Sequence, residues 1–215
     1  MINVFRSLIP KNNICVAVSG GVDSIACLHL LHRIYKSKVH ACHVNHKYQP
    51  VNDGMMASVQ RFCSDFNIPL TIAAREDSNP ITKNVEAGLR DFRLSVFKKL
   101  QMDVVLCHHL NDAVESYLMN TFKGCPEYKP IQEITELEGT SFKMIRPFLR
   151  TSKVDIQRYA ENNDLMKYVV EDPSNSDNRF MRNRVRNQII PMIHDLGLEK
   201  IVSKKFYNNI NNTLS

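Results

Sequence analysis

The chain has 215 residues, of which 43% are hydrophobic and 23% are charged, which is the composition of a globular domain and not of a disordered or fibrous protein. Its apolar runs are too short to cross a bilayer and its first residues lack the basic and apolar regions of a signal peptide, so we expect a cytoplasmic protein without a membrane anchor. The net charge of +6 lies almost entirely in the C-terminal third, which favours a partner rich in phosphates.

Short apolar strands alternate with amphipathic helices over most of the chain. Apolar, β-branched runs predict buried strands at 14–18, 39–44, 70–73 and 103–107. Apolar residues at helical spacing predict helices at 23–36, 54–66, 84–100, 111–122, 152–162 and 175–195. Segment 124–143 has two prolines and little periodicity, so we expect a connector there, and the polar residues 208–215 are expected to fray.

This alternation is the pattern of a doubly wound parallel sheet, an α/β fold in which helices cover both faces of apolar strands. We expect residues 1–150 to form the α/β domain and residues 151–215 a helical C-terminal part of the same domain. Ligands of such sheets bind at the carboxyl ends of the strands. The polar clusters at 19–24, 43–46 and 108–115 each follow a predicted strand directly, so they should converge on one cleft.

The six cysteines are scattered singly and form no C-x-x-C pair, so the sequence indicates neither a zinc cluster nor a disulfide framework. We expect buried, reduced thiols. Enzymes that transfer sulfur need paired or well-placed cysteines, and this spacing offers none.

The segment Ser19-Gly-Gly-Val-Asp-Ser24 lies between a predicted strand and a predicted helix. Its glycines allow backbone amides to approach a phosphate, the helix N-terminus adds a positive dipole, and the serine hydroxyls can donate to phosphate oxygens. The lysine of a Walker A loop is missing, which argues against simple cleavage of a terminal phosphate. A Gly-Gly turn with a Ser or Asp helix cap is the structural alternative.

These six residues resemble the pyrophosphate loop of the N-type ATP pyrophosphatases, the PP-loop superfamily with the adenine nucleotide alpha hydrolase-like fold. The resemblance implies that ATP is split between its α and β phosphates to adenylate a carbonyl oxygen, and that a nucleophile then displaces AMP. The charge that develops on pyrophosphate needs amide donors and Mg²⁺, and Asp23 would hold the metal.

Further motifs resemble those of bacterial tRNA(Ile)-lysidine synthases and occur in the same order over residues 14–191. They are His43-Val-Asn-His46, Asn84-Val-Glu-Ala-Gly-Leu-Arg90 with Arg93, His108-His-Leu-Asn-Asp-Ala-Val-Glu115, Arg146-Pro-Phe-Leu149, Glu171-Asp-Pro-Ser-Asn-Ser-Asp177 and Arg182-Asn-Arg-Val-Arg186. This second resemblance implies an ATP-dependent carbon–nitrogen ligase that joins L-lysine to the wobble cytidine in the CAU anticodon of tRNA(Ile).

The resemblance also implies a role for each matching residue. The ATP-binding residues would be Ser19, Gly20, Gly21, Val22, Asp23, Ser24, His43 and His108. The catalytic residues would be Asp23, Arg90, Asp112 and Glu115. The lysine substrate would bind to Asp112 and Glu115. The tRNA would bind to Arg146, Arg182, Asn183 and Arg186.

Each of these motifs has a plainer interpretation. Glu86 and Arg90 are spaced as a surface ion pair on a helix, and His108 could be an ordinary imidazole at a strand end. The basic excess itself is C-terminal, because residues 1–139 carry 15 basic and 14 acidic side chains while residues 140–215 carry 13 and 8. A solvated basic helix face would also account for that excess.

The sequence departs from the family pattern in three ways. After His46 the family's usual Leu-Arg is replaced by Tyr48-Gln49, so an expected basic contact is missing. Asn111 and Ala113 stand where the family commonly has an acid and a glutamine, which reduces the negative charge available to Mg²⁺ or an ammonium group. The C-terminal domains with which the family grips the tRNA body have no counterpart after about residue 195. We therefore expect a short form that reads chiefly the anticodon region or is helped by dimerisation or a tRNA-binding partner.

Two rival functions stay open. A PP-loop tRNA thiolase would activate a pyrimidine carbonyl for attack by sulfur, and the missing C-x-x-C pairs argue against it. A non-catalytic protein that binds ATP and tRNA is supported by the missing C-terminal domains and by the changes at Asn111 and Ala113. The presence of Asp23, Arg90, Asp112 and Glu115 opposes it.

Overall fold

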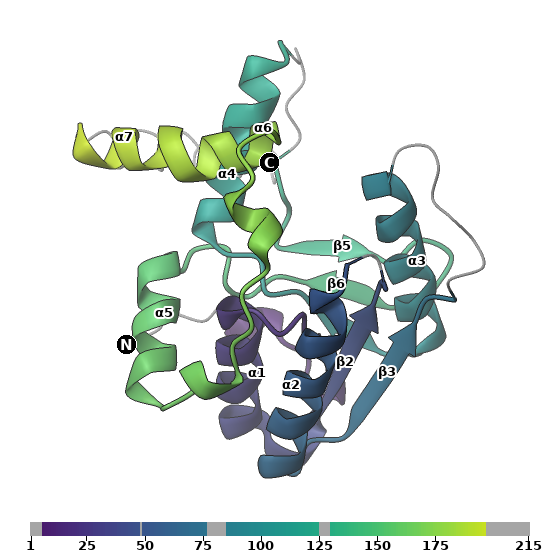
Figure 1. Ribbon diagram of the computed structural model, residues 1–215. Coiled ribbons are helices and arrows are strands. Elements are labelled where there is room, and N and C mark those ends of the chain that lie inside the picture. Colours follow the sequence, from purple (N-terminus) through teal and green to yellow (C-terminus); the bar gives the residue numbers. More distant parts are fainter. Residues whose placement is uncertain (1–5, 48, 77–84, 125–129, 197–215) are drawn as a thin grey trace.

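The computed structural model describes residues 6–47, 49–76, 85–124 and 130–196 (Figure 1). The strands are β1 (Ile14–Ala17), β2 (Val39–Asn45), β3 (Leu70–Ala74), β4 (Asp103–Val105), β5 (Ile134–Glu136) and β6 (Lys143–Ile145). The helices are α1 (Val22–Tyr35), α2 (Val51–Asp65), α3 (Val85–Lys99), α4 (Leu110–Phe122), α5 (Lys153–Asn162), α6 (Met181–Arg184), the π-helical turn η5 (Val185–Ile189) and α7 (Ile190–Asp195).

The six strands form one sheet in the order β3-β2-β1-β4-β6-β5. All neighbours are parallel except β5 and β6, which confirms the predicted parallel α/β sheet. The chain builds outward from β1 through β2 to β3 and then returns to the other side of β1 with β4. Because the strand order reverses there, the carboxyl ends of β1 and β4 border the crevice in which sheets of this kind bind ligands.

Helices cover both faces of the sheet, as predicted. Alternate residues of β1 point to opposite faces, since Ile14 and Val16 belong to one buried cluster and Cys15 to another. The first cluster includes apolar side chains of α1, α2 and α5, and the second includes those of α3. None of the helices within the described ranges is long and apolar enough to span a bilayer.

Helix α4 and the segment from α6 to α7 lie together beyond the carboxyl ends of the strands, at the top of Figure 1. The first turn of α4 is held at the sheet by Ala113, which is fully buried and clusters with Leu149. Farther along, α4 contacts α6 and η5. This arrangement brings the basic C-terminal segment onto the helix that follows β4.

The expectation of an unstructured connector at 124–143 is wrong for its second half. Strands β5 and β6 form an antiparallel hairpin there, closed by a turn with Gly139 at φ +77°. Each strand has three residues, and β5 lies at the edge of the sheet with Ile134 and Glu136 exposed. A strand so short leaves no periodicity to detect, and exposure removes its apolar alternation.

The predicted basic helix at 175–195 also begins later than expected. Residues Pro173–Ser176 form a 3-10 turn, and continuous helix starts at Met181 and includes the π-helical turn η5. Asp172 caps the 3-10 turn by accepting a hydrogen bond from the amide of Ser174. The segment Asp172–Phe180 is thus a structured loop that delivers the arginines of α6 to α4. The predicted frayed end at 208–215 lies outside the described residues.

Candidate functional site

The loop Ser19–Ser24, which follows β1, is held together by hydrogen bonds to the side chain of Ser24. Its Oγ accepts hydrogen bonds from the amides of Ser19 (3.2 Å) and Gly20 (3.1 Å) and donates one to the carbonyl of Gly21 (2.9 Å). Gly20 has φ +100°, and a Cβ there would lie 3.2 Å from the Cβ of Met55 and 3.3 Å from its carbonyl oxygen. Glycine is required at this position for both conformation and space.

Helix α1 begins directly after this loop, with Gly21 at its N-cap and no side-chain cap. The first amides of a helix have no partner within the helix and carry the positive end of its dipole. A loop of small residues that leads into such an N-terminus binds phosphate groups well. The structure places the loop at the start of a helix, as the sequence predicts, and phosphate binding by Ser19–Ser24 stays a prediction.

His43, at the carboxyl end of β2, is buried beside the same loop. Its Nδ1 lies 2.8 Å from the carbonyl oxygen of Val18, so Nδ1 carries the proton and donates a hydrogen bond to that oxygen. Burial lowers the pKa of His43, which keeps the ring neutral at neutral pH. Its Nε2 is then an acceptor, and that atom is buried without a hydrogen-bond partner. A neutral acceptor beside the phosphate loop suits a nucleotide amino group.

His109 links the loop to helix α4. Its Nε2 lies 3.6 Å from Oδ2 of Asp23 and 3.5 Å from Oδ2 of Asp112. Burial alone lowers the pKa of His109, but the two carboxylates outweigh that effect and hold its pKa above the ordinary value. The other oxygen of Asp23, Oδ1, is buried without a hydrogen-bond partner. Asp23 therefore has one carboxylate oxygen free to accept a cation or a donor.

Asp112 and Glu115 lie one turn apart on α4 and are both buried, Glu115 with 1% of its surface exposed. Burial opposes ionisation of Asp112, yet His109, His108, the His109 amide and Arg182 together keep its pKa below the ordinary value. The amide of His109 donates to Oδ2 of Asp112 at 3.0 Å, which fixes the carboxylate at the start of the helix.

Two arginines of the C-terminal segment bind this acid pair. Glu115 accepts hydrogen bonds from Nε of Arg182 (3.0 Å) and from Nε and Nη2 of Arg186 (2.7 and 3.0 Å). An Nη2 of each arginine also lies 3.4 Å from Oδ1 of Asp112. The sequence places these arginines with tRNA and these acids with lysine, and the structure brings all four side chains together. Two guanidinium groups of the chain itself therefore compensate the charge of the acid pair in this structure.

The other predicted residues lie around this centre. Arg90 is exposed on α3, and His108 lies at the end of β4 with its Nδ1 buried and unpartnered. Arg146 is 8% exposed, and its Nη1 donates to the carbonyl of Gln132 (2.9 Å) and to Oγ1 of Thr135 (3.0 Å). The amide of Asn183 is also used internally, since it donates to the carbonyls of Ser174 and Asp177.

The two residues that differ from the family pattern on α4, Asn111 and Ala113, have structural roles. Oδ1 of Asn111 accepts a hydrogen bond from the amide of Lys153 at 3.0 Å, which joins the first turn of α4 to the first turn of α5. Ala113 is fully buried against Leu149.

Sequence reasoning assigned no role to two residues that the structure places at the site. His109 bridges the loop and α4, and its signal is its position at the N-cap of a helix with an acid three residues later. Arg93 lies between Phe92 and the apolar residues Val96 and Phe97 on α3. A charged residue within the apolar stripe of a helix is the signal that could have singled it out.

The cysteines agree with the expectation as far as they are described. Cys15, Cys27, Cys42 and Cys63 are buried, and Cys107 is partly buried; all five are free, while Cys125 lies outside the described residues. Within the described ranges, no group of three or more His, Cys, Asp or Glu side chains could hold a metal ion. A metal bound at Asp23 would need most of its ligands from a substrate.

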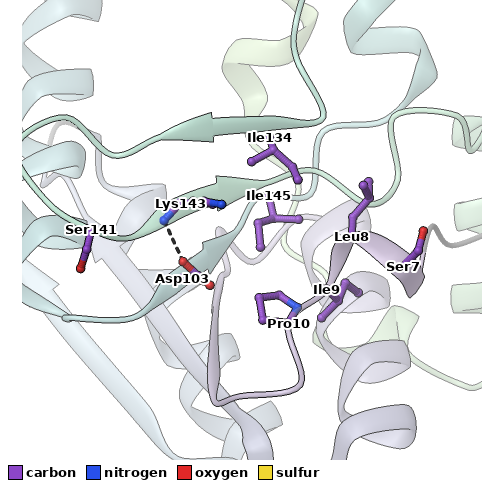
Figure 2. Close-up of a pocket in the computed structure, with 9 residues that line it drawn as sticks. All are labelled: Ser7, Leu8, Ile9, Pro10, Asp103, Ile134, Ser141, Lys143 and Ile145. Carbon is purple, nitrogen blue, oxygen red and sulfur yellow. Dashed lines mark hydrogen bonds between the residues drawn. The ribbon is translucent and has the colours of Figure 1, made fainter. Parts of the chain in front are cut away.

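A separate cavity of about 380 Å³ lies away from these residues (Figure 2). It is lined by Ser7, Leu8, Ile9, Pro10, Asp103, Ile134, Ser141, Lys143 and Ile145. Asp103 starts β4, opposite to the end that carries His108, and none of the lining residues belongs to the loop or the acid pair. The cavity plays no part in the candidate site.

A family model and relatives of known function both match most of this chain. Residues 2–193 match the PP-loop domain family. The chain is 32% identical to the tRNA(Ile)-lysidine synthase of Lactiplantibacillus plantarum over 86% of its length, and 32% identical to that of Nitrosomonas europaea over 89%. In both cases it spans only 43% of the relative. A U34-tRNA thiolase of Methanococcus maripaludis has the same fold, with a TM-score of 0.70 over 97% of this chain and 76% of that chain, at 17% identity.

Proposed function

This chain belongs to the PP-loop domain family, and from that premise we propose that it is a tRNA(Ile)-lysidine synthase. It would use ATP to activate the wobble cytidine of a CAU anticodon and then join L-lysine to it. The observation that carries the proposal is the acid pair Asp112 and Glu115, which binds cationic side chains at the edge of the crevice that holds the phosphate loop. An enzyme that joins an amine to an adenylated base needs these two features side by side.

The reaction has two steps. In the first, the C2 carbonyl oxygen of the cytidine attacks the α-phosphorus of ATP, and the bond to the β-phosphate breaks to release pyrophosphate. In the second, the ε-amine of lysine attacks C2, the C2–O bond breaks to release AMP, and the amine gives up a proton. Adenylation is necessary because an oxygen of the ring carbonyl is a poor leaving group.

The loop Ser19–Ser24 and the N-terminus of α1 would hold the phosphates of ATP, with His43 beside them. Donors that are fixed before the reaction stabilise the charge that develops on pyrophosphate. Mg²⁺, when bound, would neutralise part of that charge, and the unpartnered buried Oδ1 of Asp23 is a suitable ligand for it. His109 would orient Asp23 from the opposite side through its 3.6 Å contact.

The acid pair would bind the ε-ammonium of lysine and accept its proton before attack. Two buried carboxylates need compensating cations, and here two guanidinium groups supply them. The lysine ammonium would take over part of this compensation when it binds. Arg182 and Arg186 would then be free to contact RNA phosphates, with Arg90 supporting the activated cytidine.

The tRNA would approach the face that carries α4 and the segment from α6 to α7. The arginines of the segment that packs against α4, which are Arg182, Arg184 and Arg186, support this orientation, because they put positive charge beside α4. A cytoplasmic location and help from dimerisation or a tRNA-binding partner are part of the same proposal.

Incorporation of radiolabelled lysine into an unmodified CAU-anticodon tRNA(Ile) transcript, with ATP and Mg²⁺, tests the proposed function. We expect labelling by the wild-type protein, none by Asp23→Ala, and none of an initiator methionine tRNA. Labelling of both tRNAs would preserve the chemistry and refute selection by this chain alone. Binding of ATP and tRNA without any labelling would favour the non-catalytic binder.

A further inference from the structure

Arg93 is a guanidinium without a hydrogen bond or ion pair to any other described residue. Its Nε is buried and unpartnered, and it lies on the apolar stripe of α3 that packs against the sheet. Arg146 is almost as unusual, because it is 8% exposed and its Nε is also buried and unpartnered, while its Nη1 reaches only neutral oxygens. Buried charges in proteins are normally paired, so the two arginines together indicate a missing anion.

The two arginines approach the same end of the sheet from different elements. Arg146 directly follows β6 and His108 comes shortly after β4, two strands that are parallel neighbours and stay joined by the 2.8 Å bond between the Leu106 amide and the Ile145 carbonyl. His46 directly follows β2, and its ring lies 6.0 Å from that of Phe92, the neighbour of Arg93. Carboxyl ends of parallel strands and the face of α3 therefore enclose one basic cluster, which consists of His46, Arg90, Arg93, His108 and Arg146.

The members of this basic cluster repel one another. Burial lowers the pKa of Arg146 to about 10, with Arg90 and Arg93 adding to the effect. Burial and then Arg90 and Arg182 lower the pKa of Arg93. Burial lowers the pKa of His46 and of His108 to about 4, so both rings are neutral and each presents a buried, unpartnered Nδ1.

Two acids near the basic cluster, Asp112 and Glu133, are paired with other residues. Asp112 is bound by His109, Arg182 and Arg186, and Glu133 accepts from Nε of Arg150 at 2.9 Å. No ion pair joins a carboxylate to Arg90, Arg93 or Arg146 within the described ranges. An anionic ligand would supply the charge that these described residues do not.

We propose that the basic cluster is a phosphate-binding subsite, separate from the Ser19–Ser24 loop, in which Arg93 is the principal ligand. The planar fork of a guanidinium matches the oxygens of a phosphate, and the neutral imidazoles can donate or accept at its edge. The subsite borders the crevice at the carboxyl ends of β1 and β4, because His108, a member of the basic cluster, lies just after β4. It deepens the proposed function, although phosphate binding here does not require that lysine be ligated.

Two sources of phosphate meet at this crevice under the proposed function. One is the polyphosphate chain of ATP or the pyrophosphate released from it, and the other is the backbone of the RNA whose base is modified. The same cluster chemistry serves either, so the experiment has one arm for each source.

The test measures binding of inorganic pyrophosphate, of ATP and of a CAU anticodon stem-loop RNA to the full chain and to Arg93→Gln. Loss of one charge-assisted contact should weaken the binding of the true ligand roughly 10- to 100-fold. Arg93→Lys keeps the charge but not the fork and should fall between the two. Arg158→Gln is the matched control, since Arg158 is exposed on α5 and only 3.6 Å from a single carboxylate, Asp155.

The thermal midpoint without ligand separates a binding role from a structural one. An uncompensated buried charge destabilises the folded state, so Arg93→Gln should melt at the same or a higher temperature than the wild type. Weaker binding of pyrophosphate and ATP alone would assign the subsite to the nucleotide. Weaker binding of RNA alone would assign the subsite to the RNA backbone. In that case the slope of the logarithm of the RNA binding constant against the logarithm of the salt concentration should fall by roughly 1.

Unchanged affinity for all three ligands would overturn the proposal, and so would a lower melting temperature with unchanged affinity. A protein that fails to ligate lysine but binds pyrophosphate or RNA through Arg93 would contradict the proposed function and leave the subsite standing.

Discussion

Replacement of Arg186 by glutamine tests whether the basic C-terminal segment holds the acid pair as the structure describes. Arg186 donates to both oxygens of Glu115, at 2.7 and 3.0 Å, and Glu115 has only 1% of its surface exposed. The variant leaves this buried carboxylate with Arg182 as its one remaining cation, at 3.0 Å. The folded protein then keeps most of the cost of burying the charge while losing most of its compensation.

The size of the effect follows from these contacts. Breaking a buried ion pair by removing one partner costs about 3–5 kcal/mol. Because Arg182 retains one hydrogen bond to Glu115, we expect the free energy of unfolding to fall by about 2–3 kcal/mol, less than that full range. For a chain of this length the same loss lowers the melting temperature by about 4 to 12 °C.

Urea denaturation of four proteins measures this: wild type, Arg186→Gln, Glu115→Gln and the double variant. The double variant should be more stable than Arg186→Gln alone, because it no longer buries an uncompensated charge. Arg179→Gln is the control, since Arg179 is 87% exposed and pairs only with Asp177. A loss below about 0.5 kcal/mol for Arg186→Gln, or additive effects of the two substitutions, would refute the described network.

Three further predictions concern the same site. Gly20→Ala should lower the free energy of unfolding by about 1–3 kcal/mol and weaken ATP binding, because Gly20 has φ +100° and Met55 lies close to it. Gly54→Ala is the control: nothing lies within 4 Å of a Cβ there, so it should raise the free energy of unfolding by about 0.5–1 kcal/mol. Urea titrations of both variants measure these changes. The two carboxylates raise the pKa of His109, so its contribution to stability is complete below its unfolded-state pKa of about 6.5 and is lost as the pH rises through the higher folded-state pKa. The difference in free energy of unfolding between wild type and His109→Gln should therefore shrink as the pH rises above about 6.5. A difference that does not change with pH would exclude the carboxylate contacts as its cause. Free L-lysine should raise the melting temperature of Arg186→Gln more than that of the wild type, and norleucine, which lacks the ammonium group, should raise neither; equal effects of both amino acids would show that the acid pair does not bind the amine.

The parts of the fold that the sequence predicts well are those in which one physical pattern dominates. Strand β1 is a continuous apolar run, β2 is mostly apolar, and α1 and α3 carry apolar residues at helical spacing. The bounds of these elements agree with expectation to within about two residues. The hairpin of β5 and β6 could not be predicted, because its three-residue strands are stabilised by pairing with β4 and not by their own residues.

The candidate site shows the same division. The loop Ser19–Ser24 has a local geometry that its glycines enforce, so the sequence is sufficient to identify it. The contacts of Arg182 and Arg186 with Glu115 join residues about 70 positions apart, and no local pattern encodes such a pairing. The unpartnered Arg93 likewise becomes visible only when the carboxyl ends of β2, β4 and β6 are brought together.

In the proposed function the loop Ser19–Ser24 serves adenylation and the acid pair serves ligation. Separate measurement of the two half-reactions tests this assignment most directly. Exchange of labelled pyrophosphate into ATP in the presence of CAU-anticodon tRNA(Ile) reports adenylation, and transfer of labelled lysine reports ligation. We predict that Asp23→Ala loses both and that Glu115→Gln keeps the exchange while losing the transfer. Equal loss of both half-reactions in Glu115→Gln, or transfer at the wild-type rate, would contradict the account.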